Sequence, residues 1–197
     1  WIGTSLLANS VPLDNLLAPW PTFTHLYELL TNNLLTAHIA ASLLRVAVSL
    51  LCSLIIGIPI GILVGQSKIL ETISNGSFQL LRMISPLSWM PVVVMLFGIG
   101  NSPIFFLLTF AAVWPIILNT IAGVKSINAS WLQLGNSLSA TRFEMLRHII
   151  FPAIFSSVLN GLRLAIGVVW IVLVPCEMLG VNEGLGYFIL DTRDRLA

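Results

Sequence analysis

Charged residues are scarce in this chain. Asp, Glu, Lys and Arg together make up 9% of its 197 residues, whereas 57% are hydrophobic, and the mean hydropathy is +0.97. A soluble fold of this size could not bury so large an apolar share. Because its apolar runs are long enough to be membrane helices, we expect an all-α, polytopic membrane protein.

Other absences exclude whole classes of function. The net charge is +1 and no cluster of Lys or Arg occurs, so we expect no nucleic-acid partner. There is no G-x-x-x-x-G-K-[ST] phosphate loop through which the chain could bind ATP. The two cysteines, Cys52 and Cys176, lie far apart and suit packed helices better than a disulfide. We identify no catalytic or metal-ligating residue.

The apolar runs predict four membrane spans. Residues 46–67 carry no formal charge over 22 positions, and none occurs for 42 positions between Arg82 and Lys125, which suits two crossings. Turn residues at 98–103 separate those two. The expected spans are approximately residues 38–65, 69–98, 103–125 and 152–176, within a single domain that occupies residues 1–197.

Two features inside the spans predict packing and lining. Gly57, Gly61 and Gly65 recur every four residues and would let another helix approach closely. The second span should break before Pro86, because a residue that precedes proline avoids the helical conformation. Broken helices in membranes are tolerated where they line a cavity. Ser85, Pro86 and Trp89 are therefore candidate lining residues of a translocation path, with a purely structural kink as the alternative.

Three charged residues fall within the expected spans or directly after one of them. Arg45 either extends to the lipid headgroups or faces the path of an anion. Arg163 in the fourth span would also suit an anion. Glu177 follows an apolar run, so it either marks the interface or contributes to gating or ligand contact.

The longest polar interruption, residues 128–150, reads as two short helices joined by a bend. Leu132, Leu134 and Leu138 fall on or near one face of the first helix. A bend follows at Ser139, and a second helix begins at Thr141.

Thr141 and Glu144 have the spacing of a capping box, in which each side chain accepts from the other residue's backbone N–H. Phe143, Leu146 and Ile150 form the expected apolar stripe of this second helix. The segment must lie in water or on a water-facing partner.

Basic residues indicate the orientation, since they favour the cytoplasmic side. Segments 1–37 and 177–197 are then periplasmic, and residues 23–35 form an interfacial helix or an ordered loop. The inside set is Lys68, Arg82, Lys125, Arg142 and Arg147, whereas Arg193 and Arg195 fall outside, near four carboxylates.

The polar segment resembles the cytoplasmic loop of ATP-binding-cassette (ABC) importer permeases. That loop carries a Glu-Ala-Ala triplet, a glycine and an Ile-x-Leu-Pro motif, and the spacing is kept here at 133–135, Ser139 and 149–152. Gln133 replaces the carboxylate, Ser139 the glycine and Phe151 the leucine. Short segments elsewhere in the chain resemble the permeases of nitrate, sulfonate, taurine, bicarbonate and cyanate importers. These segments are residues 41–45, 57–61, 85–91, 97–100, 119–123, 161–163 and 177–179.

This resemblance implies a type I importer permease core, a non-catalytic subunit in the bacterial inner membrane. The polar segment would be a coupling helix against two ABC ATPase subunits, which hold ATP and Mg²⁺, so this chain binds no cofactor itself. A second permease subunit (a homodimer), a periplasmic or lipid-anchored solute-binding protein and membrane lipid are the other implied partners. The implied coupling residues are Gln133, Leu134, Gly135, Leu138, Ser139, Thr141, Phe143, Glu144, Ile149, Phe151 and Pro152.

The implied cargo is a small anion: nitrate or nitrite, bicarbonate, cyanate, or a sulfonate such as taurine. Family members have a further helix at each end, so we expect this chain to be a fragment. The alternatives are a secondary transporter or channel driven by an ion gradient, which usually places a carboxylate or histidine mid-membrane, and a membrane scaffold protein.

Overall fold

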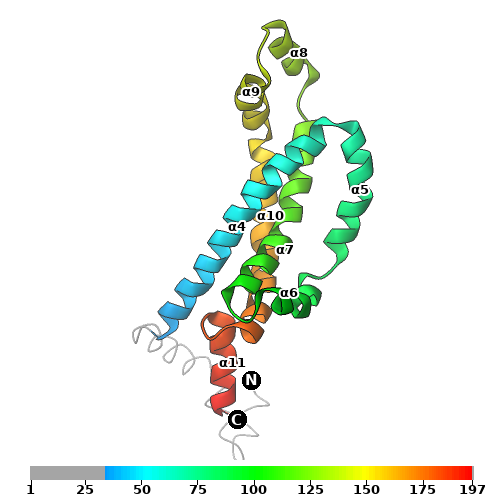
Figure 1. Ribbon diagram of the computed structural model, residues 1–197. Helices are drawn as coiled ribbons and strands as arrows, with labels where there is room; N and C mark the ends of the chain where they lie inside the picture. The colour runs from blue at the N-terminus through cyan, green and yellow to red at the C-terminus, as the bar shows by residue number, and fades with distance from the viewer. Residues whose placement is uncertain (1–33, 197) are drawn as a thin grey trace, which may run out of the picture.

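The computed structural model describes residues 34–196, which are helical with short connections and contain no strand (Figure 1). The all-α prediction is confirmed. The expected interfacial segment at residues 23–35 lies almost wholly outside the described residues. The elements are α4 (Leu34–Gln66), α5 (Lys68–Met83), η1 (Pro86–Trp89), α6 (Met90–Phe97), α7 (Asn101–Lys125), α8 (Ala129–Ser137), α9 (Arg142–Met145), η2 (Leu146–Ile150, a π-helix), α10 (Phe151–Gly180) and α11 (Leu185–Leu196).

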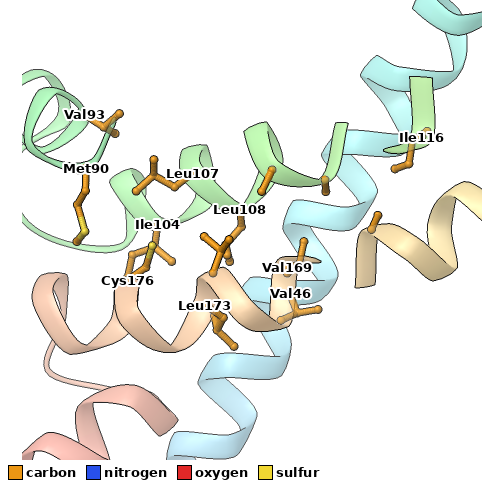
Figure 2. Close-up of a cluster of buried hydrophobic side chains, with 14 residues drawn as sticks. Val46, Met90, Val93, Ile104, Leu107, Leu108, Ile116, Val169, Leu173 and Cys176 are labelled. Atoms are coloured by element: carbon orange, nitrogen blue, oxygen red, sulfur yellow. The ribbon is translucent and has the colours of Figure 1, made fainter. Parts of the chain in front are cut away.

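Three helical stretches are long and apolar enough to cross a membrane: Leu35–Gln66, Asn101–Lys125 and Arg142–Gly180. Figure 1 shows α7 and α10 side by side with α4 slanted across them. The apolar window of α7 is the most buried of the three, at 56% against 33% for the other two. Its inward side chains, together with those of α10, form the core drawn in Figure 2: Ile104, Leu107, Leu108, Ile116, Val169 and Leu173.

The glycine strip of α4 lies directly against α7, as the four-residue spacing predicts. A Cβ atom added at any of its three glycines would collide with an α7 side chain, so the two helices are as close as their backbones allow. The distances from such a Cβ are 2.8 Å to Ile116 Cγ2 at Gly57, 2.6 Å to Thr120 Cβ at Gly61 and 2.8 Å to Val124 Cβ at Gly65.

The expected second span, residues 69–98, is a bent pair of helices. The predicted break before Pro86 is confirmed: α5 ends at Met83, and the segment Pro86–Phe97 leaves it at 83°. Arg82 lies in the last turn of α5, whereas Lys68 begins that helix. Arg82 and Lys68 therefore lie at opposite ends of α5, and Lys68 is at the end near Lys125.

The helix that holds the expected fourth span extends beyond residues 152–176 at both ends. One helix runs from Arg142 to Gly180 and includes the π-helical turn just before Pro152. Proline has no N–H to donate, and the backbone N–H of Phe151 donates to Leu146 O five residues back, as in other π-helical turns. Because the helix continues through Pro175, Glu177 lies inside it.

We expect Gly61→Ala to destabilise the protein by about 1–3 kcal/mol, because the added methyl group would overpack the contact with Thr120. The matched control is Gly76→Ala on α5, where an added Cβ meets nothing within 4 Å. Unfolding temperatures of the two variants in detergent test this. Equal values would mean that the α4–α7 contact is not tight.

Candidate functional site

The polar interruption forms a hairpin of α8 and α9 that projects beyond the ends of α4 and α7 (Figure 1). We call residues 126–150 the polar hairpin. Asn128 caps α8, its Oδ1 accepting from Ser130 N at 3.0 Å. At the base of the hairpin an ion pair joins Lys125 to Glu71 of α5.

The turn between α8 and α9 is a Schellman motif, which closes a helix end with two backbone hydrogen bonds. Ala140 N donates to Gly135 O at 3.0 Å, and Ser139 N donates to Asn136 O at 3.0 Å. The expected bend at Ser139 is confirmed, because this residue has a positive φ in the left-handed region that favours glycine. This is the position where the resemblance expects glycine.

The predicted capping box at Thr141 and Glu144 is confirmed. Glu144 N donates to Thr141 Oγ1 at 3.3 Å, and Thr141 N donates to Glu144 Oε2 at 2.8 Å. The backbone N–H and then the hydroxyl of Thr141 lower the pKa of Glu144. The box is thus formed at neutral pH and is lost only as the pH falls through that lowered pKa.

Large apolar side chains cover the outside of the polar hairpin although this part lies outside the apolar spans. We call these four side chains the apolar tip: Trp131 (55% exposed), Leu134 (61%), Leu138 (73%) and Phe143 (70%).

The expected faces of the two short helices are partly wrong. Leu132 packs inward against the cluster around Ile150, and Phe143 points outward while Ile150 is buried. Gly135 determines which side of α8 faces inward, because this side lies so close to the next helix that an added Cβ would be 2.8 Å from Ile149 Cδ1. The sequence pattern did not single out Trp131, although its spacing to Leu134 and Leu138 follows one helix face.

The remaining hairpin candidates lie on its surface or at its base. Gln133, Thr141 and Glu144 are exposed, whereas Ile149 is half-buried. Phe151 and Pro152 begin α10 and are exposed.

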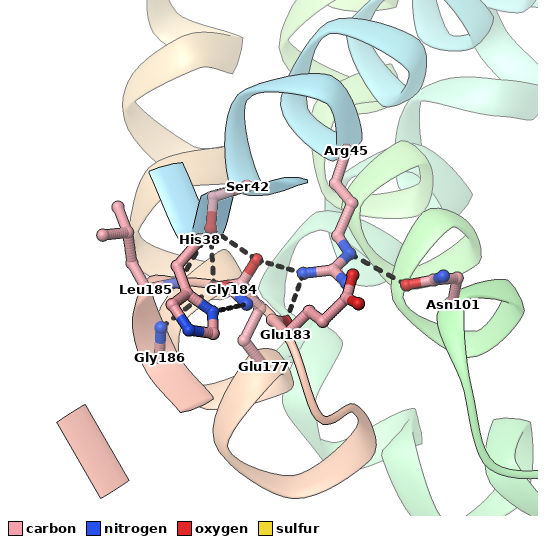
Figure 3. A network of polar contacts seen from close by, with 9 residues as sticks. All are labelled: His38, Ser42, Arg45, Asn101, Glu177, Glu183, Gly184, Leu185 and Gly186. Atoms are coloured by element: carbon pink, nitrogen blue, oxygen red, sulfur yellow. Dashed lines mark hydrogen bonds and ion pairs between the residues drawn. The ribbon is translucent and has the colours of Figure 1, made fainter. Parts of the chain in front are cut away.

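At the opposite end of the spans, Arg45 and Glu177 form a buried ion pair with Nη1–Oε1 of 2.7 Å (Figure 3). Their side chains are 4% and 0% exposed. Ser42 Oγ donates to both carboxylate oxygens, at 2.7 and 2.9 Å, and Gly186 N donates to Oε2 at 2.9 Å. We call the group of Arg45, Glu177, Ser42, Gly186 and Asn101 the Arg45 corner. Arg45 does not extend to the headgroups, because its charge is paired inside the protein.

The Arg45 corner joins four parts of the chain. Arg45 Nε donates to Asn101 Oδ1 at 2.9 Å at the start of α7, and Nη1 donates to Glu183 O at 2.8 Å in the loop before α11. That loop passes so close that a Cβ at Gly184, whose φ is also positive, would lie 2.4 Å from Glu177 Cδ. Only glycine fits there, both for space and for backbone conformation.

The candidate path residues do not form one site. Arg45 and Glu177 are in the corner, and Arg45 also borders an open hollow of about 560 Å³ with Glu183 and Tyr187. Pro86 lines a separate cavity between α5, α7 and α10, whereas Ser85 and Trp89 are exposed nearby. Arg163 is exposed on α10 and lines neither space.

Residues 34–196 contain no group of three His, Cys, Asp or Glu side chains placed to hold a metal ion. Cys52 is exposed and Cys176 is buried, and both are free thiols.

Comparison with known families identifies the chain's class. The family described as binding-protein-dependent transport system inner membrane component matches residues 57–196. The chain belongs to this family. The expected resemblance is confirmed, and this family member is a multi-pass protein of the inner membrane.

Several family members are similar over most of this chain. The nitrate import permease protein NrtB of Leptolyngbya laminosa is 37% identical over 78% of the chain and 55% of its own length. The taurine transport system permease protein TauC of Escherichia coli is 34% identical over 81% and 58%. The bicarbonate transport system permease protein CmpB of Synechococcus elongatus is 37% identical over 77% and 55%. The chain thus spans a little over half the length of these relatives.

Replacing Ser139 by glycine should stabilise the polar hairpin by up to about 1 kcal/mol, because an L residue pays a penalty in the left-handed region. Hydrogen exchange at the amides of Leu138 and Ala140 should become slower. In the control Ser137→Gly, a glycine enters regular helix and exchange should become faster. Faster exchange in Ser139→Gly would contradict the motif.

Glu177→Gln should destabilise this family member by about 3–5 kcal/mol, because it leaves the Arg45 guanidinium buried and uncompensated. Asp194→Asn, which removes the exposed partner of Arg193, should change stability by less than about 1 kcal/mol. The unfolding temperatures of both variants in detergent provide the measurement. A Glu177→Gln variant as stable as Asp194→Asn would show that the buried pair contributes little.

Proposed function

We propose that this chain is the transmembrane permease subunit of an ATP-driven ABC importer that moves a small anion into the cytoplasm. The cargo class is nitrate or nitrite, bicarbonate, cyanate or a sulfonate such as taurine. The substrates in the relatives' names support this class. The observation that carries the proposal is the apolar tip, displayed on a polar hairpin outside the spans.

The apolar tip has the character of a protein-docking surface. Exposed clusters of large apolar side chains in an aqueous region mark interaction sites. Here two caps and a Schellman turn hold their backbone, so the surface is ordered before a partner binds. In the proposal each of two ATPase subunits, which bind ATP and Mg²⁺, receives one such hairpin, and this chain binds no nucleotide.

The remaining partners follow from the same proposal. A second copy of the chain completes the path, a solute-binding protein delivers the anion at the end that holds the Arg45 corner, and membrane lipid surrounds the spans. Glu177 offers no free carboxylate to an ion-coupled mechanism, because Arg45, Ser42 and Gly186 occupy it. It positions the outer ends of α4 and α10 instead.

The test is reconstitution of the full-length permease with its ATPase and binding protein in liposomes. We expect uptake of labelled nitrate, bicarbonate or taurine that requires ATP, and ATP hydrolysis stimulated by the loaded binding protein. Uptake that persists without ATP and stops when ion gradients are dissipated would instead identify a secondary transporter. A protein that transports none of the probes and retains no ATPase would fit the scaffold alternative.

Leu138→Asp should abolish ATP-dependent uptake while leaving membrane insertion intact, because it places a charge at the centre of the apolar tip. ATPase co-purification should fall at least tenfold, which corresponds to about 1.4 kcal/mol. The control Leu138→Met keeps an apolar side chain of similar size and should retain uptake. Normal uptake by Leu138→Asp would contradict the docking role.

A further inference from the structure

The bend between α5 and α6 leaves a cavity that the proposed coupling does not explain. It has a volume of about 260 Å³ and lies between the end of α5, the middle of α7 and α10. Apolar side chains such as Leu164 and Val168 form much of its wall. Its volume falls below the roughly 300–1,000 Å³ of sites for drug-sized ligands, which suits a small ion with a few waters.

Arg82 supplies the charge of this cavity. Its guanidinium has no ion pair and no hydrogen bond with any residue between 34 and 196. It lies in the last turn of α5, nearly the whole length of that helix away from Lys68, and the residue is exposed, so its charge is accessible to an ion. An arginine within a membrane span generally faces a cavity or a partner, because lipid cannot solvate it.

The other polar groups of the cavity wall are also hydrogen-bond donors. Trp114 contributes an indole whose Nε1 is buried and has no hydrogen-bond partner among the described residues. Asn119 Nδ2 donates to Pro115 O at 2.8 Å. An amide nitrogen carries two hydrogens, so one of them remains available. The lining residues include no Asp or Glu. A wall with one cation, unused donors and no carboxylate is complementary to an anion.

We propose that this cavity is an oxyanion-binding subsite within the membrane, in which Arg82 supplies the charge, Asn119 donates a hydrogen bond, and a small rotation of the Trp114 ring brings its buried N–H to the anion. This inference rests on the proposed function, since it places the transported anion at the bend of α5 and α6. Arg163 is not part of the subsite, because the neighbouring Leu164 faces the cavity in its place.

The experiment uses the reconstituted complex with nitrate, bicarbonate and taurine as probes. Arg82→Gln should reduce uptake at least tenfold while ATP hydrolysis without anion stays within twofold of the unmodified complex. Arg82→Lys should retain part of the uptake. The matched control Arg193→Gln removes an exposed arginine of α11 and should leave both rates unchanged. Uptake by Arg82→Gln equal to that of Arg193→Gln would overturn the subsite.

A second measurement avoids substitution of the charged residue. Millimolar nitrate should raise the unfolding temperature of the unmodified complex, and Trp114→Phe, which keeps an aromatic ring and removes the N–H, should reduce that rise. An undiminished rise would contradict the role of Trp114. If the unmodified complex transports none of the probes, the proposed function itself fails, whereas normal transport with no effect of Arg82→Gln removes only the subsite.

Discussion

Close backbone contact between α7 and its neighbours is the constraint on which this membrane protein depends. Lipid tails are as apolar as leucine, so helices in a bilayer associate through fit and not through the hydrophobic effect. On one side α7 meets the glycine strip of α4. On the other, a Cβ at Gly161 of α10 would lie 3.1 Å from Ile116 Cα, and one at Gly123 would lie 2.7 Å from Ser157 Cβ. The three spans therefore form one block that resists internal sliding.

The two polar elements lie at opposite ends of that block. The Arg45 corner ties α4, α7 and α10 together at one end, and the polar hairpin extends from α10 at the other (Figure 1). Because one continuous helix runs from Arg142 to Gly180, a displacement of the hairpin is transmitted along that whole helix. In the proposed transport cycle the three spans then rotate together as a rigid body, as domains do in other switching proteins. The bend between α5 and α6 accommodates the movement of this block relative to α5.

Features that depend on neighbours in sequence could be predicted, and those that depend on distant partners could not. The capping box lies within four consecutive residues and the glycine strip repeats within one helix, so the sequence pattern was sufficient to predict both. The partner of Arg45 lies 132 residues away and leaves no local signal. The inward face of α8 was missed for the same reason, because Gly135 sets it through contact with Ile149 of the next helix. Leu132 shares that face, which turns Trp131 outward.

The contrast between Arg45 and Arg82 separates a structural charge from a ligand-binding one. Both are arginines within the membrane part of the chain, and composition cannot distinguish them. Arg45 donates to a carboxylate, an amide oxygen and a backbone carbonyl, so its burial is compensated and no anion can compete for it without unpairing Glu177. Arg82 has no such partner in the described part of the chain and borders a largely apolar cavity whose few polar side chains are hydrogen-bond donors. Its charge can be compensated there by a mobile anion, and a site that must release its ligand needs a cation that the protein has not already neutralised.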